Sequence, residues 1–225
     1  MNAIRSLTTK TPAAIALGCA MLLAAGCGAL PDKPARATLY DFGPGPAASA
    51  SAPAPATLPT LSLAEFESNS RLEGTQILYR LGYADVNELR PYGQSRWSLP
   101  PSQLLRQRLR DTLSERRMVL GPEEAATISR GRGEAPDTLR ISLDEFSHYF
   151  DSASTSTGLV RLRATLVRTT SGGDRVLGQR LFTVRRPAPS AVAPGGVKAL
   201  VAGRDAPVAE VVQGVEPLQE QQPRQ

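Results

Sequence analysis

The sequence predicts an α+β fold: a mainly antiparallel sheet with two helices packed on one face, preceded by a signal peptide and a Pro/Ala-rich spacer. Three observations support this prediction. Residues 139–186 hold long runs in which apolar and polar residues alternate, as strands with one buried face require. Apolar residues recur with helical spacing after the prolines at 100–101, and again after Pro194.

Residues 1–26 are predicted to be a lipoprotein signal peptide. Arg5 and Lys10 precede residues 13–30, which carry no charge, and a basic start before a short apolar run is the layout of a secretory signal. A permanent membrane helix needs roughly 20 strongly apolar residues, whereas much of this run is alanine and glycine. Cleavage is therefore expected.

Cys27 is the predicted lipidation site. The stretch Leu-Ala-Ala-Gly-Cys at 23–27 resembles a bacterial lipoprotein signal, in which small side chains precede a cysteine already linked to diacylglycerol. Two alternatives stay open: acylation of Cys19 instead, and ordinary signal cleavage with Cys27 incidental. If Cys27 is acylated and Cys19 removed, no thiol remains for a disulfide, a metal or catalysis. In proteobacterial lipoproteins, an Asp directly after the acylated cysteine tends to retain the protein in the inner membrane. Here Gly28 follows Cys27, so the outer membrane is the expected destination.

Composition sets the remaining domain limits. Residues 43–58 are rich in Pro, Ala, Ser and Gly and almost without charge, so they are predicted to form an extended spacer. Residues 37–42 have the composition of a short strand, and the polar tail from Glu216 is predicted to be disordered. The expected division is 1–26 signal peptide, 27–58 lipidated N-terminus with a short strand and spacer, 59–215 folded domain, and 216–225 tail.

The first part of the domain is predicted to hold two short strands and a link. Residues 59–65 and 75–81 have the length and apolar content of strands, and residues 90–101 are predicted to be a turn-bearing link. This link contains Arg96 and Trp97, the only tryptophan. Trp and Arg are enriched in binding hot spots, so the pair is a candidate partner contact, although a core position for Trp97 is the favoured interpretation.

A helix is predicted from the prolines at 100–101 to Arg117. Proline suits the first turn, and Ser102 is expected to cap the exposed amides. Leucines at 105, 109 and 113 form one apolar stripe. The arginines at 106, 110 and 117 are interpreted as a solvated face rather than a docking face for an acidic partner or lipid headgroups.

Residues 137–151 are predicted to be a strand with a β-bulge. Apolar residues occupy odd positions up to Leu143 and even positions from Phe146, and a bulge near 144–145 produces such a shift. His148, the only histidine, is interpreted as a packed structural residue rather than a site residue. Residues 159–168 alternate again, and residues 175–186 return as their partner strand across a Gly-rich turn.

The last element is predicted to be a helix over about residues 197–215, where valines and leucines recur at helical spacing. Gly203 and Pro207 weaken this prediction, and a kink is expected near Pro207.

The sequence excludes several kinds of chemistry. It contains no glycine-rich phosphate loop, and one histidine without a spare thiol removes Cys/His dyads and zinc sites. Asp144 and Glu145 are adjacent on a strand and point to opposite faces, and neither Lys33 nor Lys198 lies in a hydrolase motif. The net charge of +5 and the eleven aromatic residues do not suit nucleic-acid binding. We therefore expect no enzyme activity, no cofactor and no metal.

Five segments, with the cysteine signal before them, resemble one family, the ABC-type transport auxiliary lipoproteins, which includes the paraquat-inducible C lipoproteins. The resemblance covers about residues 35–215, and its departure is the C-terminus, where the family often has a Leu/Trp-rich helix. The segments are GTQILYRLG (74–82), SRWSLPPSQLLRQRLRDTL (95–113), LRISLDEFSHYFDSASTSTGLVRLRATLVR (139–168), RLFTVRRPAP (180–189) and PGGVKAL (194–200).

The resemblance implies a lipid-anchored, non-enzymatic accessory subunit of an envelope lipid transporter, acting in the periplasm at the outer membrane. The implied partners are a protein with mammalian-cell-entry domains and its ABC permease and ATPase; phospholipid and further copies of the chain are additional candidates. It implies no catalytic residues, so Cys27 is the one firmly assigned site. The alternatives are a lipoprotein that itself binds a hydrophobic ligand between sheet and helices, and an outer-membrane assembly factor.

Overall fold

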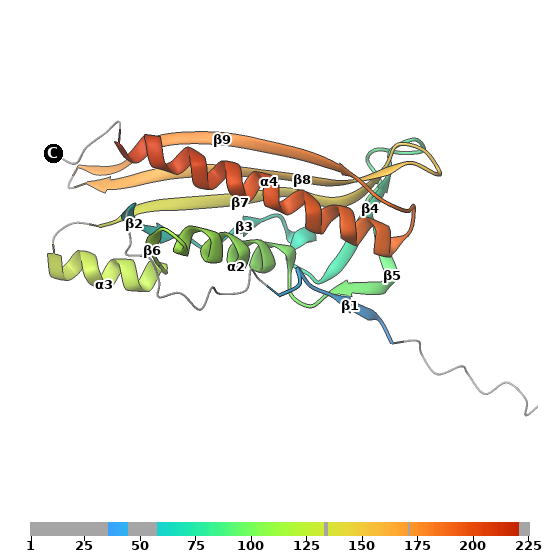
Figure 1. Cartoon of the computed structure of the whole chain (residues 1–225), viewed down its shortest axis with the longest axis horizontal. Helices are drawn as coiled ribbons and strands as arrows, with labels where there is room; N and C mark the ends of the chain where they lie inside the picture. The colour runs from blue at the N-terminus through green and yellow to red at the C-terminus, as the bar shows by residue number, and fades with distance from the viewer. Residues whose placement is uncertain (1–35, 45–57, 133–134, 171, 221–225) are drawn as a thin grey trace, which may run out of the picture. The chain divides into compact units, whose positions relative to one another are not determined.

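The computed structural model describes residues 36–44, 58–132, 135–170 and 172–220. The predicted signal peptide, Cys27 and most of the spacer lie outside these residues. The described residues from Ala37 onward belong to one compact unit, whose elements are shown in Figure 1.

The sheet is built around one long strand, β7 (Asp137–Phe150). On one side of β7 run β8 (Ser156–Thr170) and β9 (Gly173–Pro187), each antiparallel to its neighbour. This arrangement confirms the predicted strands over 137–151 and 159–168 and the return strand. The three strands lie side by side along the length of the sheet (Figure 1).

The other side of β7 is shared by three short strands that are all parallel to it. They are β2 (Leu58–Leu63), β3 (Glu67–Ser68) and β4 (Gln76–Leu81), and they pair with successive stretches of β7. The sheet is therefore mixed, and the predicted mainly antiparallel pairing is wrong on this side. Parallel strands need a crossover connection, and apolar alternation does not reveal which strands are joined in that way.

Three outer strands complete the sheet within the described residues. The strand β6 (Arg117–Leu120) is parallel to β2, β5 (Arg90–Trp97) is antiparallel to β4, and β1 (Thr38–Tyr40) is parallel to β5. The short strand expected within residues 37–42 is thus present. The predicted link over 90–101 is wrong for its first eight residues, which form β5.

The helix α2 (Pro101–Ser114) buries the predicted leucine stripe at 105, 109 and 113. Its N-cap is Pro100 and has no side-chain cap, so the capping role predicted for Ser102 is wrong. Arg117 lies in β6 with a side chain only 1% exposed, which contradicts the solvated face predicted for it. The helix α3 (Pro122–Arg132) was not predicted, and it is a third helix where two were expected.

The helix α4 (Ala193–Glu220) is longer than predicted and runs through Pro207 and Pro217 as one element. The disordered tail expected from Glu216 is wrong as far as Glu220, since Gln219 is buried. Tertiary packing outweighs the poor local propensity, because Val208, Val211 and Val215 all face the core.

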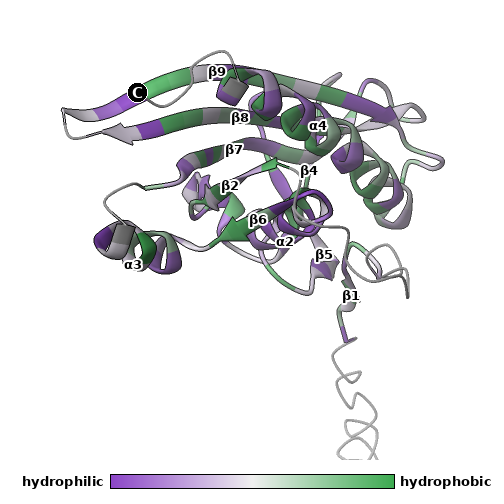
Figure 2. Ribbon diagram, turned by 60° about the vertical axis from the view of Figure 1, so that its left-hand side comes forward, coloured by the Kyte–Doolittle hydropathy of each residue, from purple (hydrophilic) through white to green (hydrophobic). Residues whose placement is uncertain are grey.

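The core lies between the sheet and the helices. The helix α4 packs on β7, β8 and β9, and α2 packs against α4 and β6. Figure 2 shows apolar stretches on β8, β9 and α4, which pack against one another. The helices α2 and α4 cover one face of the sheet, as predicted for two helices, whereas α3 contacts β2 and β6. Within the described residues, no helix combines the length and apolar character needed to cross a bilayer.

The predicted bulge in β7 is confirmed, because the register with β8 shifts between Leu143 and Glu145. The shift turns Phe146 and His148 toward the helices, where both are at most 1% exposed. The opposite face holds Glu145, which accepts hydrogen bonds from Arg80 and Ser147. Arg80 also donates a hydrogen bond to the backbone carbonyl of Val86, which ties the loop after β4 to the side chain of a sheet residue.

Candidate functional site

Residues 36–44, called the arm below, enter the core at Phe42. The Phe42 ring meets Trp97 edge-on at 5.7 Å between centroids and lies 6.0 Å from Phe146. Trp97 and Phe146 are themselves 5.6 Å apart. Aromatic pairs at these separations stabilise a core beyond the area they bury. The three rings therefore fix the arm to the domain.

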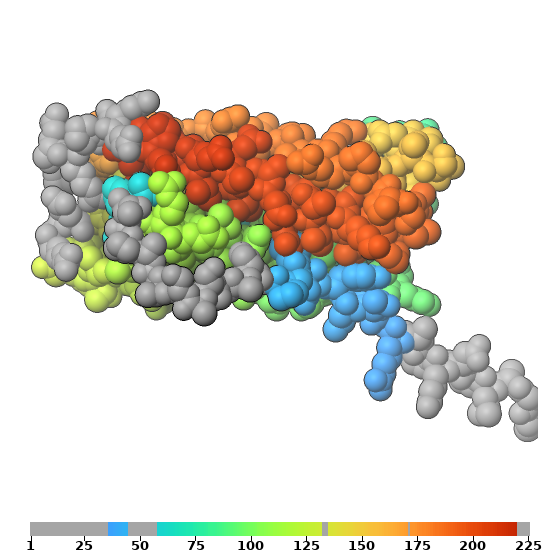
Figure 3. All heavy atoms as spheres, viewed as in Figure 1, coloured from blue at the N-terminus to red at the C-terminus, as the bar shows by residue number. Residues whose placement is uncertain are grey.

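Arg204 of α4 holds the same arm from the other side. Its guanidinium lies 4.6 Å from the centre of the Phe42 ring, and Nη1 donates a hydrogen bond of 2.6 Å to the Phe42 carbonyl. Arg204 Nε donates to Asp205 at 3.1 Å, and Asp205 also lies 3.6 Å from Arg108 of α2. Figure 3 shows residues 36–44 lying against α4 and next to α2.

The candidate contact residues Arg96 and Trp97 point to opposite sides of β5. Trp97 is 1% exposed and belongs to the core, as its favoured interpretation expected. Arg96 is half-buried and donates hydrogen bonds to the backbone carbonyls of Tyr92 and Ser95. Its register partner on β1 is Leu39, which is 68% exposed. The surface at this position is thus formed by Arg96 and Leu39.

His148 is fully buried between two hydroxyl groups. Its Nδ1 lies 2.8 Å from Tyr92 Oη and its Nε2 lies 2.7 Å from Ser156 Oγ. Burial lowers the pKa of His148 from 6.5 to about 4 and raises the pKa of the Tyr92 hydroxyl above its usual range. A Ser–His pair can serve as nucleophile and base, but Ser156 is also buried, so a substrate has no access to its hydroxyl. His148 is the packed residue that the sequence predicted.

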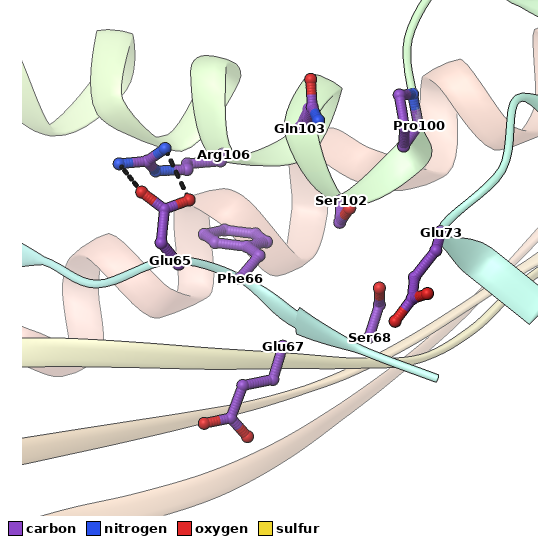
Figure 4. Close-up of a pocket in the computed structure, with 9 residues that line it drawn as sticks. All are labelled: Glu65, Phe66, Glu67, Ser68, Glu73, Pro100, Ser102, Gln103 and Arg106. Carbon is purple, nitrogen blue, oxygen red and sulfur yellow. Dashed lines mark hydrogen bonds and ion pairs between the residues drawn. The ribbon is translucent and has the colours of Figure 1, made fainter. Parts of the chain in front are cut away.

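A polar cleft opens between the start of α2 and the segment from β2 to the 3₁₀ turn η1 (Ser70–Leu72) (Figure 4). It has a volume of about 390 Å³. Glu65 and Arg106 form a two-fold ion pair at one end, with distances of 2.8 and 2.7 Å. At the other end Ser102 points toward Ser68 and Glu73. The nine lining residues are Glu65, Phe66, Glu67, Ser68, Glu73, Pro100, Ser102, Gln103 and Arg106.

The apolar space between the helices and the sheet is nearly filled. A gap lined by residues such as Phe66, Leu105 and Val208 has a volume of about 10 Å³, which is about the space of one water-sized probe. Among the described residues no group of histidine, cysteine and acidic side chains could hold a metal ion.

Sequence reasoning missed both Phe42 and Arg204, and it missed the cleft. Phe42 stands at the edge of the Pro/Ala-rich stretch, where no periodicity marks a core residue. Arg204 lies 162 positions from Phe42, so nothing local signals their contact. The acids of the cleft lie in three different places, the loop after β2 (Glu65), β3 (Glu67) and the end of η1 (Glu73), so no periodic pattern groups them in the sequence.

Comparisons with known proteins agree with this fold. A family model described as the ABC-type transport auxiliary lipoprotein component matches residues 40–213. No curated protein sequence is significantly similar to the chain.

Solved structures show the same fold at low sequence identity. A Xanthomonas campestris protein of the DUF330 family matches with a TM-score of 0.62 and 20% identity, over 75% of this chain and 92% of its own. A second crystal structure, of an uncharacterized protein, matches with a TM-score of 0.56 and 16% identity, over 80% of this chain and 99% of its own. Because the family model spans most of the described domain, the chain belongs to the ABC-type transport auxiliary lipoprotein family.

Proposed function

We propose that the protein is a lipid-anchored, non-enzymatic subunit of an ABC-type envelope lipid transporter, working in the periplasm at the outer membrane. The proposed partners are a protein with mammalian-cell-entry domains and its permease and ATPase. The observation that carries the proposal is the family match over residues 40–213 to a transport auxiliary component. The chain carries no phosphate loop, so energy would come from the ATPase of the assembly.

The docked arm supports a role for the anchor. If Cys27 is acylated, the eleven residue steps from Cys27 to Thr38 span at most about 40 Å. Phe42 is buried and Arg204 binds its carbonyl, so the tether would end in the core rather than in a loose tail. An acyl anchor with two or more chains is stable in a bilayer. The folded unit would therefore stay near the membrane surface.

The sheet supplies surfaces for the proposed protein partners. Within the described residues, β1, β6 and β9 each pair on one side only, and unpaired strand edges can accept a strand from another chain. Arg96 and Leu39 lie next to the β1 edge. We propose this edge, with Arg96, as a partner contact, and the same edges would also serve a homo-oligomer.

A ligand-binding role finds less support. An acyl chain needs an apolar cavity, and pockets for small molecules usually measure about 300–1,000 Å³. The apolar gap between helices and sheet is about 10 Å³. A lipid held there would require α2 or α4 to move away from the sheet.

The anchor is tested by fatty-acid labelling in cells. We expect Cys27→Ser to abolish labelling and to release the protein from membranes, while Cys19→Ser leaves both unchanged. Labelling that survives Cys27→Ser but is lost in Cys19→Ser would overturn the assignment. Density-gradient separation of the two membranes then reports the location, with the outer membrane expected.

The transport role is tested by purifying the lipidated protein in mild detergent. We expect a mammalian-cell-entry protein to copurify and the domain to hold no stoichiometric lipid. About one phospholipid per chain without a protein partner would instead support the ligand-binding alternative.

A further inference from the structure

We propose that one end of the sheet, called the membrane end below, contacts the bilayer that holds the acyl anchor and inserts apolar side chains into it. The membrane end consists of the loop after β4 (residues 82–89), the turn between β7 and β8 (151–155) and the segment between β9 and α4 (188–192). The inference rests on the proposed function, because it takes Cys27 to be acylated. It adds which residues of the folded domain touch lipid.

Strand pairing brings these three segments to one end of the sheet. Leu81 at the end of β4 pairs with Phe150 at the end of β7, and Thr157 near the start of β8 pairs with Pro187 at the end of β9. The helix α4 then begins at Ala193. The ends of β7 and β9 and the start of α4 therefore lie together, as Figure 1 shows on its right-hand side.

The strand β1 also begins toward this end. It is parallel to β5, and β5 starts beside the end of β4, where Arg90 pairs with Tyr79. Because β1 runs away from the membrane end, the chain that precedes Thr38 leads toward it. Eleven residue steps, which span at most about 40 Å, separate Thr38 from Cys27. An anchor at Cys27 would therefore draw this end of the sheet toward the bilayer.

The membrane end carries three exposed apolar side chains on two separate loops. Tyr83 and Val86 are each 51% exposed, and Val192 is 56% exposed. A single exposed apolar residue is ordinary, but a group of them is typical of a surface that contacts a partner or a membrane. Tyrosine suits the interface of a bilayer, because its ring is apolar while its hydroxyl stays in contact with water.

The loop that carries Tyr83 and Val86 is held in place by buried polar groups. Arg80 donates hydrogen bonds to the backbone carbonyls of Val86 and Asn87 at 3.1 and 3.4 Å. Its guanidinium also binds both carboxylate oxygens of the buried Glu145, at 3.3 and 3.2 Å. Because the loop is already ordered, its insertion into lipid would cost less conformational entropy than insertion of a loose loop.

The charges at this end suit anionic headgroups. Arg186 at the end of β9 and Lys198 near the start of α4 are exposed, and neither forms an ion pair within the described part of the chain. The three segments contain three acids. Two of them, Glu88 and Asp151, are each paired with an arginine, and Asp85 accepts a hydrogen bond from a backbone N–H. Exposed basic side chains are attracted to anionic lipids, so the charges would support the apolar contact.

The test uses tryptophan as a reporter of lipid contact in the acylated, full-length protein. The protein is reconstituted into vesicles of phosphatidylethanolamine and phosphatidylglycerol, part of which carries bromine on the acyl chains and quenches a tryptophan that reaches them. The natural Trp97 is the only tryptophan and is 1% exposed, so the unchanged protein should show no quenching. We expect Tyr83→Trp and Val192→Trp to add fluorescence that the brominated lipid removes.

Met118→Trp is the matched control. Met118 is 55% exposed and lies in β6, which pairs with β2, and β2 pairs with the first residues of β7. Met118 is therefore at the opposite end of the sheet, and brominated lipid should leave the emission of Met118→Trp unchanged. Val86→Asp, added to Tyr83→Trp, places a charge in the inserted loop and should reduce the quenching to the level of this control.

Two results would overturn the inference: quenching of Met118→Trp as strong as that of Tyr83→Trp, or quenching of neither. It is also overturned if the emission of Tyr83→Trp is not quenched in vesicles but moves to shorter wavelength when a copurified protein binds in detergent, because the loop would then be a protein contact. Mass spectrometry of the same sample reports acylation. A chain without fatty acids overturns the anchor and this inference together, whereas an acylated chain without quenching overturns this inference alone.

Discussion

Gln219 donates a hydrogen bond of 3.1 Å from Nε2 to Oδ2 of Asp137, which stands 82 positions earlier in the chain. Asp137 is 1% exposed and also accepts two hydrogen bonds of 2.8 Å from Arg168. The amide oxygen of Gln219 accepts a hydrogen bond of 2.7 Å from the buried Arg117. The last turn of α4 is thereby bound to the starts of β6 and β7 and to the end of β8.

We predict that Gln219→Ala lowers the free energy of unfolding by about 1–3 kcal/mol, because a buried donor on Arg117 loses its acceptor. Burial already lowers the pKa of the Arg117 guanidinium, so the charge is costly without a partner. Urea denaturation measures the change. Gln213→Ala is the control, since Gln213 is exposed on the same helix. Equal stability of both variants would contradict a structural role for this hydrogen bond.

The same residues show why sequence reasoning failed at this end. The segment from Glu216 is polar and holds a proline, so its local pattern predicts disorder. Its order comes from Asp137, which lies 82 residues away, and from Arg117, which lies 102 residues away. No local signal encodes such contacts. The same holds for the cleft, whose walls meet only after β3 pairs with β7.

Features set by local pattern were predicted well. The bulge followed from a change of parity between Leu143 and Phe146, and the leucine stripe of α2 followed from its spacing. The direction of strand pairing was not predicted, because β2, β3 and β4 are short and their alternation is the same in parallel and antiparallel sheets. The core position of Trp97 was the favoured interpretation, but its contact with Phe42 was not predicted.

A second prediction concerns the close approach of α4 to β8. A Cβ atom at Gly158 would lie 2.6 Å from the backbone of Ala199 and Leu200, so α4 must shift to admit one. We expect Gly158→Ala to lower the free energy of unfolding by about 1–3 kcal/mol through this overpacking.

Gly214 provides the matched control for this substitution. It lies inside α4, and a Cβ atom added there would have no heavy atom within 4 Å outside its own stretch of helix. Gly214→Ala should therefore raise stability by about 0.5–1 kcal/mol. Thermal unfolding of the two variants should thus move in opposite directions. A stabilising Gly158→Ala would show that α4 is not held at this distance.

A third prediction concerns pH. Burial lowers the pKa of His148 from 6.5 to about 4, so the folded protein binds this proton less readily than the unfolded chain. The contribution of His148 to stability is complete above pH 6.5 and is lost as the pH falls from 6.5 to about 4. The loss amounts to about 3 kcal/mol at the acid end of this range.

The single histidine allows this pH dependence to be measured directly. In protein without a histidine tag, the one imidazole NMR signal should keep its neutral shift down to about pH 5. Urea denaturation at pH 7 and pH 4.5 should show a smaller pH dependence for His148→Gln than for the unchanged chain. A signal that titrates near 6.5 would mean that the imidazole is reached by water and not enclosed by Tyr92 and Ser156.

The last prediction tests whether the arm is part of the core. Phe42→Ala removes a ring that contacts Trp97 and Phe146, and truncation of a buried Phe costs about 3–5 kcal/mol. Water should then reach Trp97, the only tryptophan, and shift its fluorescence emission to longer wavelength. Leu39→Ala is the control on the same arm, because Leu39 is 68% exposed and should change neither stability nor emission. If Phe42→Ala leaves the emission of Trp97 unchanged, the arm does not close the core, and a tether at Cys27 would hold the domain less closely than proposed.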